Sequence, residues 1–184
     1  MQRERSSVVV LAGPNGAGKS TMAAELVVDV LGVSEFVDAD VFARTLPRSG
    51  AAAITAGRAM LRRLDELGAS RRSFAPRIRK LTRAGYECHL VFLWLQSADL
   101  AVARVADRMR LGGHAVPEQT IRRRYRSGLR NFFALYRPLT TTWRMYDNST
   151  HELRLIASGA GRETRGINDP GLWERIRAEA EDEG

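Results

Sequence analysis

Eight residues near the start of the chain have the types and spacing of a phosphate-binding loop. Residues 13–20 read GPNGAGKS, which matches the pattern Gly-x-x-x-x-Gly-Lys-Ser/Thr at every fixed position. Glycines let backbone N–H groups close around a phosphate because no Cβ stands in the way. An ammonium at Lys19 can reach the β- and γ-phosphates of a nucleotide, and the Ser20 hydroxyl can bind Mg²⁺. The predicted nucleotide-binding residues are Gly13, Pro14, Asn15, Gly16, Ala17, Gly18, Lys19, Ser20 and Thr21.

The lysine of this loop is unusual in a chain that otherwise uses arginine. Lys and Arg together number 29, and Lys occurs only at Lys19 and Lys80. A compact ammonium and a planar guanidinium are not interchangeable. We therefore expect position 19 to need a point charge on a slim side chain, as a phosphate site does. The alternative is a glycine-rich turn between a strand and a helix that binds no ligand.

Strand and helix patterns alternate around the loop. Residues 7–12 form a short β-branched run typical of a buried parallel strand, and residues 20–31 have helical spacing. Further strands are predicted at 35–38, 87–95, 143–146 and 152–157, and further helices at 51–67, 76–84, 98–111, after 117 and from 170. This alternation predicts an α/β fold of the P-loop NTPase class: a doubly wound, mainly parallel sheet with flanking helices, in one domain spanning 1–184.

Composition limits the class of protein. The 184 residues are 44% hydrophobic and 27% charged, as in globular domains. Cys88 is the only cysteine, which excludes an internal disulfide and a cysteine-rich zinc site. The apolar runs are too short for a membrane span or a signal peptide, so we expect a cytoplasmic protein with no membrane partner. The net charge of +8 favours anionic partners, although solvated surface arginines explain it equally well.

Among nucleotide-binding proteins, the pattern favours small-molecule kinases. The strand at 87–95 ends in Leu-Gln-Ser, without the acidic residue of motors and transporters, and no Asn-Lys-x-Asp motif of GTPases is present. Asp40 follows the second predicted strand, where an acid points toward the crevice in which an acceptor binds and can act as a base. Its alternative role is to cap the following helix. Asp38 is predicted to be structural.

Several stretches together resemble the zeta-toxin family of P-loop kinases. They are AGPNGAGKST, FVDADVFA, GYECHLVFLWLQS, ARVADRMRLGGHAVPEQTIRRRY, MYDNS and LIASG, which lie within residues 7–160. The resemblance implies transfer of phosphate from ATP, with Mg²⁺, to the sugar 3′-hydroxyl of UDP-N-acetylglucosamine. It also implies neutralisation by a small antitoxin protein, and nucleic acid is not expected as a partner.

The resemblance also assigns roles to single residues. The implied catalytic set is Lys19, Asp40, Arg104 and Arg108. Arg104 matches a family arginine that neutralises charge on the transferred phosphoryl group, and Arg108 lies one turn further along the same helix face. The alternative for both is a solvated helix face. A second phosphate-contacting arginine of the family falls near His114, where the match fails, and Arg110, His114 and Arg123 are candidates to replace it.

One segment departs from the family pattern. Family members carry a strand and a loop with a Glu-Thr-Thr type motif after the helix equivalent to 51–67. Here only the seven residues 69–75 lie between Gly68 and Pro76, too few for a strand of about five or six residues and its connections. We therefore expect the sheet to lack one family strand and the Glu-Thr-Thr segment with it, and we expect turnover to be impaired by the missing segment. Another small-molecule or nucleic-acid-end kinase, or a catalytically decayed nucleotide-binding protein, remains an alternative.

Overall fold

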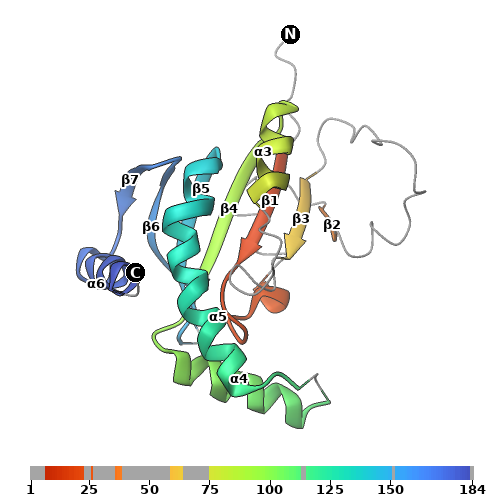
Figure 1. Cartoon of the computed structure of the whole chain (residues 1–184), viewed down its shortest axis with the longest axis vertical. Helices are drawn as coiled ribbons and strands as arrows, with labels where there is room; N and C mark the ends of the chain where they lie inside the picture. The colour runs from red at the N-terminus through yellow and green to blue at the C-terminus, as the bar shows by residue number, and fades with distance from the viewer. Residues whose placement is uncertain are drawn as a thin grey trace.

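A computed structural model describes residues 7–22, 26, 36–38, 59–63, 75–112, 115–150 and 152–182. These residues contain a seven-stranded sheet in the order β2-β3-β1-β4-β5-β6-β7, with helices packed on it (Figure 1). The strands are β1 Ser7–Ala12, β2 Phe36–Asp38, β3 Ala59–Arg63, β4 Glu87–Trp94, β5 Thr142–Asp147, β6 Arg154–Ala160 and β7 Glu163–Ile167. The helices are α3 Ala75–Arg83, α4 Ala98–Arg110, α5 Glu118–Asn131 and α6 Pro170–Glu181. A π-helical turn η1 (Phe132–Tyr136) and a 3₁₀ turn η2 (Arg137–Leu139) continue α5.

The centre of the sheet is parallel. β1 pairs in parallel with β3 and β4, β2 pairs in parallel with β3, and β4 pairs in parallel with β5. β6 and β7 add an antiparallel extension beside β5. The predicted fold class is therefore confirmed: an α/β fold with a five-stranded parallel core and flanking helices. The carboxyl ends of these parallel strands meet at one edge of the sheet, where ligands of such folds bind.

The structure corrects the predicted helix at 51–67. Residues Ala59–Arg63 form β3, which lies between β2 and β1, and Met60 is in register with Val37 on one side and Val8 on the other. The expectation that the sheet lacks a strand is therefore wrong. A segment of five residues cannot be assigned to helix or strand from periodicity alone, and here pairing with β1 over 60–63 and with β2 over 59–61 provides partners for its backbone polar groups. Residues 51–58 and 64–74 lie outside the described residues.

Alternating side chains of β1 separate two hydrophobic layers. Val8 and Val10 face a cluster that includes Ile78 of α3 and Trp173 of α6. Val9 faces a second cluster, whose helical members include Ala101 and Val105 of α4 and Ile121 and Tyr125 of α5. This period of two is the pattern of a strand that is buried on both faces. The two layers hold β1, and the loop that follows it, in a fixed position.

Most other predicted elements are confirmed, with small differences at their ends. Ser97 caps α4 by accepting a hydrogen bond from the Leu100 N–H, and Asp169 caps α6 by accepting one from the Leu172 N–H. β7 was not predicted. Residues 113 and 114, between α4 and α5, lie outside the described residues. No helix in the described ranges is both long and apolar enough to cross a membrane.

Gly159 of β6 allows the antiparallel extension to pack closely. A Cβ added there would lie 2.0 Å from the carbonyl oxygen of Glu163 and 2.5 Å from the Trp143 ring. That ring stacks on Trp173 with the centroids 5.7 Å apart. The tryptophan pair is therefore packed against the backbone of β6 without room for a side chain.

We predict that Gly159→Ala lowers the free energy of unfolding by about 2–3 kcal/mol, because the added methyl group must displace a backbone strand or a buried ring. Gly171→Ala in α6 is the matched control, since its nearest neighbour would be Asp169 Oδ1 at 3.9 Å. We expect it to change stability by less than about 1 kcal/mol. Urea unfolding of both variants measures the difference, and equal stability would contradict the close packing.

Candidate nucleotide-phosphate site

The phosphate loop connects β1 to a helix. Residues 13–18 follow the carboxyl end of β1, and residues 19–22 and 26 are helical. Gly16 and Gly18 adopt φ angles of 79° and 80°, which side chains other than glycine rarely allow. The Ala17 N–H donates to the Pro14 carbonyl at 3.1 Å and closes the turn. Glycines at these positions therefore let the chain make a tight turn. This turn lies at the carboxyl ends of the parallel strands.

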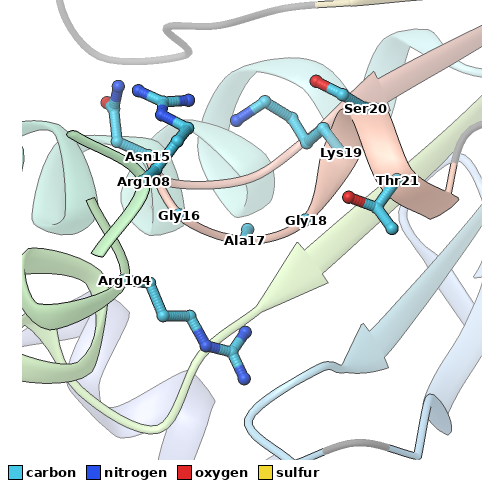
Figure 2. Close-up of a pocket in the computed structure, with 9 residues that line it drawn as sticks. All are labelled: Asn15, Gly16, Ala17, Gly18, Lys19, Ser20, Thr21, Arg104 and Arg108. Atoms are coloured by element: carbon cyan, nitrogen blue, oxygen red, sulfur yellow. The ribbon is translucent and has the colours of Figure 1, made fainter. Parts of the chain in front are cut away.

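A basic cavity of about 280 Å³ lies over this loop. Its lining residues are Asn15, Gly16, Ala17, Gly18, Lys19, Ser20, Thr21, Arg104 and Arg108 (Figure 2). Each charged residue among them is a cation. An anion of the size of a phosphate chain suits this lining, because backbone N–H groups at the start of a helix and fixed cations both favour negative charge.

Lys19 extends over the loop. Its side chain is buried, with 6% exposure, and Nζ donates to the carbonyl oxygens of Gly13 and Pro14, both at 2.9 Å. Figure 2 shows the ammonium on the same side of the loop as Arg108. A slim, flexible stem suits this position beside the backbone better than a planar guanidinium does. The ammonium is thus held where a phosphate lying on the loop would meet it.

The hydroxyl groups after the lysine suit a magnesium ion better than a zinc ion. Ser20 and Thr21 are exposed and line the cavity. The described residues contain no group of three or more His, Cys, Asp or Glu side chains that could hold a metal. Mg²⁺ commonly binds through few protein ligands together with phosphates and water. The residues therefore fit a Mg²⁺ ion held by Ser20 and a bound nucleotide.

Arg104 and Arg108 lie on opposite sides of the loop. Arg104 Nη1 donates to the Asn148 carbonyl at 2.7 Å and Nη2 to the Ser149 carbonyl at 3.0 Å. Its guanidinium lies on the far side of the loop from Lys19, whereas that of the exposed Arg108 lies on the near side (Figure 2). The phosphoryl-neutralising role implied for Arg104 stays a prediction. In the structure it joins α4 to the turn after β5.

A further arginine approaches the loop from α5. Arg124 Nη1 lies 3.4 Å from Asn15 Oδ1 of the loop. Its neighbour Tyr125 donates to the Leu95 carbonyl at 2.8 Å and fixes α5 to the end of β4. Burial is the main cause that raises the pKa of Tyr125, so this hydroxyl keeps its proton. Arg124 is one of three consecutive arginines at 122–124, and only the fold shows which of them faces the loop.

The candidates to replace the second family arginine are placed elsewhere or not described. Arg110 and Arg123 are exposed, and Arg110 pairs with Asp107 at 2.9 Å. His114 lies outside the described residues. Asp40 also lies outside them, two residues after the end of β2. Its role as a base stays a prediction, although β2 belongs to the parallel set whose carboxyl ends lie beside the loop.

The turn after β5 supports the loop from behind. Asn148 Nδ2 donates to the Ala17 carbonyl at 2.9 Å, and the Asn148 N–H donates to the Trp94 carbonyl at 3.0 Å. Asp147 accepts from the Ser149 N–H and from Arg154, both at 2.8 Å. Burial alone would raise the pKa of Asp147, but these hydrogen bonds outweigh it and lower the pKa below its ordinary value. Asn148 is therefore held in a rigid, charge-stabilised turn.

A strand, a glycine loop, a helix and a basic cavity lie together at the carboxyl edge of a parallel sheet, which is the arrangement of a P-loop fold. No protein-family model matches the sequence, and no curated protein sequence does. The fold is similar to that of a solved complex of AvrRxo1-ORF1 and -ORF2 with ATP, with a TM-score of 0.60 and 15% identity. That similarity covers 94% of this chain but only 63% of the other, so the chain spans less than two thirds of that relative's length.

A second solved structure belongs to the PezAT chromosomal toxin–antitoxin system of Streptococcus pneumoniae. It has a TM-score of 0.55 and 12% identity, and the similarity covers 99% of this chain and 87% of the other. The resemblance to the zeta-toxin family is thereby confirmed at the level of the fold. At such low identity, similarity in structure does not extend to substrate or activity.

We predict that Arg104→Ala lowers the free energy of unfolding by about 1–3 kcal/mol, because two charge-assisted hydrogen bonds are lost. Arg108→Ala, one turn away and exposed, should change stability by less than about 0.5 kcal/mol and weaken ATP binding about fivefold. Urea unfolding and calorimetry measure the two effects. An Arg104→Ala variant with wild-type stability that loses only phosphoryl transfer would favour the role implied by the resemblance.

Proposed function

We propose that the chain is a single-domain, ATP- and Mg²⁺-dependent phosphotransferase of the zeta-toxin type, which acts on a sugar hydroxyl of UDP-N-acetylglucosamine. The observation that carries the proposal is the cavity formed by the glycine loop, Lys19 and Arg108 in a P-loop kinase fold. The structural similarity to a complex that contains ATP supports ATP as the nucleotide. The similarity to a toxin–antitoxin system supports a small antitoxin as the protein partner.

The residues of the cavity would act mainly by positioning and charge stabilisation, as phosphoryl transfer requires. The loop N–H groups and Lys19 would bind the β- and γ-phosphates, and Ser20 would hold Mg²⁺, which would supply positive charge that neutralises the phosphates. Arg108 lines the same cavity, and Arg124 reaches Asn15 at its rim. Both cations would stabilise charge that develops on the transferred group.

The acceptor would bind beside the carboxyl ends of β2 and β3. Asp40 follows β2 in the sequence, and we propose it as the base that accepts the proton of the sugar hydroxyl. The expected impairment of turnover depended on a missing strand and on the Glu-Thr-Thr type loop that accompanies it in the family. Since β3 is present, the half of that reason that concerns the strand no longer applies. Asp65 and Glu66 follow β3 in the sequence, and they are the acids that we propose for contacts with the acceptor.

A nucleotide-binding protein without phosphoryl transfer is the second candidate. One observation favours it: Arg104, which the resemblance assigns to the transferred phosphoryl group, is engaged with the carbonyls of Asn148 and Ser149. The two candidates share ATP binding and differ in turnover. An assay of transfer to UDP-N-acetylglucosamine therefore separates them.

We predict that Lys19→Ala weakens ATP·Mg²⁺ binding about 10- to 100-fold, the loss expected for one charge-assisted interaction. Transfer of the labelled γ-phosphate to UDP-N-acetylglucosamine should fall at least about 100-fold. Lys80→Ala is the matched control, because it removes the only other lysine, which is exposed on α3. Calorimetry and the transfer assay should show it to be like wild type.

The two measurements have separate meanings. Equal ATP affinity of wild type and Lys19→Ala would contradict the assignment of the loop as a nucleotide site. ATP binding that depends on Lys19, without transfer to any sugar nucleotide, would favour the second candidate. Transfer to a different hydroxyl compound would keep the kinase and change its acceptor.

A further inference from the structure

Asn148 is the residue in the turn after β5 that contacts the phosphate loop. Its side-chain Nδ2 donates to the carbonyl oxygen of Ala17 at 2.9 Å. Asn148 is buried, with 9% exposure, and Ala17 is completely buried. We propose that Asn148 is a positioning residue of the phosphate site, which orients the Ala17–Gly18 peptide so that the Gly18 N–H faces the bound phosphate. This inference rests on the proposed function of the loop as a nucleotide site.

The geometry of the peptide unit links the orientation of the Ala17 carbonyl to that of the Gly18 N–H. The Ala17 carbonyl and the Gly18 N–H belong to one planar trans peptide, in which C=O and N–H point in opposite directions. Asn148 holds the carbonyl from behind the loop, and Gly18 lines the cavity on the other side. A donor fixed on the carbonyl side therefore fixes the direction of the N–H on the phosphate side.

Asn148 can perform this task because its own backbone is held twice. Its N–H donates to the Trp94 carbonyl at 3.0 Å, and its carbonyl accepts from Arg104 at 2.7 Å. The first contact joins Asn148 to the end of β4 and the second to α4. The side-chain amide thus extends from a rigid base. Its orientation is also determined, since the Ala17 oxygen is only an acceptor and must meet the NH₂ group.

Gly18 allows the amide to approach this closely. A Cβ at position 18 would lie 2.7 Å from Asn148 Nδ2, a distance so short that the side chain of Asn148 would have to shift. The second glycine of the motif therefore has two functions in this protein. It lets the backbone curl with φ at 80°, and it leaves room for Asn148 behind the loop.

Asn148→Asp is the sharpest test, because the carboxylate has the same shape but no donor and would face the Ala17 oxygen with like charge. We expect ADP·Mg²⁺ to bind about 10- to 100-fold more weakly. Asn168→Asp is the matched control, since it makes the same chemical change at an exposed asparagine. Asn148→Ala removes the donor without adding charge. We therefore expect it to weaken ADP·Mg²⁺ binding by about fivefold, which is less than the effect of Asn148→Asp.

A spectroscopic measurement separates positioning from general destabilisation. In wild type, inorganic pyrophosphate should shift the amide proton signals of both Gly16 and Gly18. In the Asn148 variants the Gly16 signal should still shift and the Gly18 signal should not. The near-UV circular dichroism of the stacked Trp143 and Trp173 shows independently that each variant is folded. Should Asn148→Asp fail to fold, Asn148→Ala gives the same readout.

The outcomes distinguish this inference from the proposed function. Weaker binding and loss of the Gly18 shift in both folded Asn148 variants, with Asn168→Asp like wild type, would support the positioning role. Wild-type affinity and a wild-type Gly18 shift in the Asn148 variants, while Lys19→Ala still weakens binding, would overturn it and leave the nucleotide site intact. Wild type that binds neither ADP nor pyrophosphate would overturn the proposed function, and the positioning role with it.

Discussion

A loop that turns its N–H groups toward a ligand must turn carbonyl groups away from it, and those carbonyls need partners where they are buried. The hydrogen bond from Asn148 to Ala17 meets this requirement. Asn148 is in turn held by two hydrogen bonds to its backbone. Arg104 of α4 donates to its carbonyl oxygen, and the carbonyl of Trp94 in β4 accepts from its N–H. The loop, the end of the sheet and α4 are therefore connected through one turn.

The charges of the site depend on the same scaffold. Lys19 belongs to the loop motif itself, whereas Arg108 and Arg124 come from α4 and α5. Apolar contacts of Ala101, Val105, Ile121 and Tyr125 with the sheet hold these two helices in place. Figure 1 shows α4 at the end of the sheet toward which β1 and β3 point. Cations of three elements thus gather where the carboxyl ends of the parallel strands meet.

The sequence predicts the fold class and the loop because both depend on local patterns: a β-branched strand, a glycine motif and helical spacing. It does not predict β3, since Ala59–Arg63 is too short for its period to be decisive and its pairing partners are distant in the chain. The contact of Asn148 with Ala17 spans 131 positions. The contacts of Arg104 with the turn after β5 are also non-local, since they span 44 and 45 positions. A helix face can therefore be predicted, but not which of its arginines faces the loop.

The most direct test of the account is a crystal structure of the protein with Mg²⁺ and a non-hydrolysable ATP analogue. We expect the β-phosphate within about 3 Å of the Gly18 N–H and of Lys19 Nζ, the usual hydrogen-bond distance. Mg²⁺ should bind the Ser20 hydroxyl, while Asn148 keeps its bond to Ala17. A nucleotide bound elsewhere, or phosphates held without contact to residues 16–20, would contradict it.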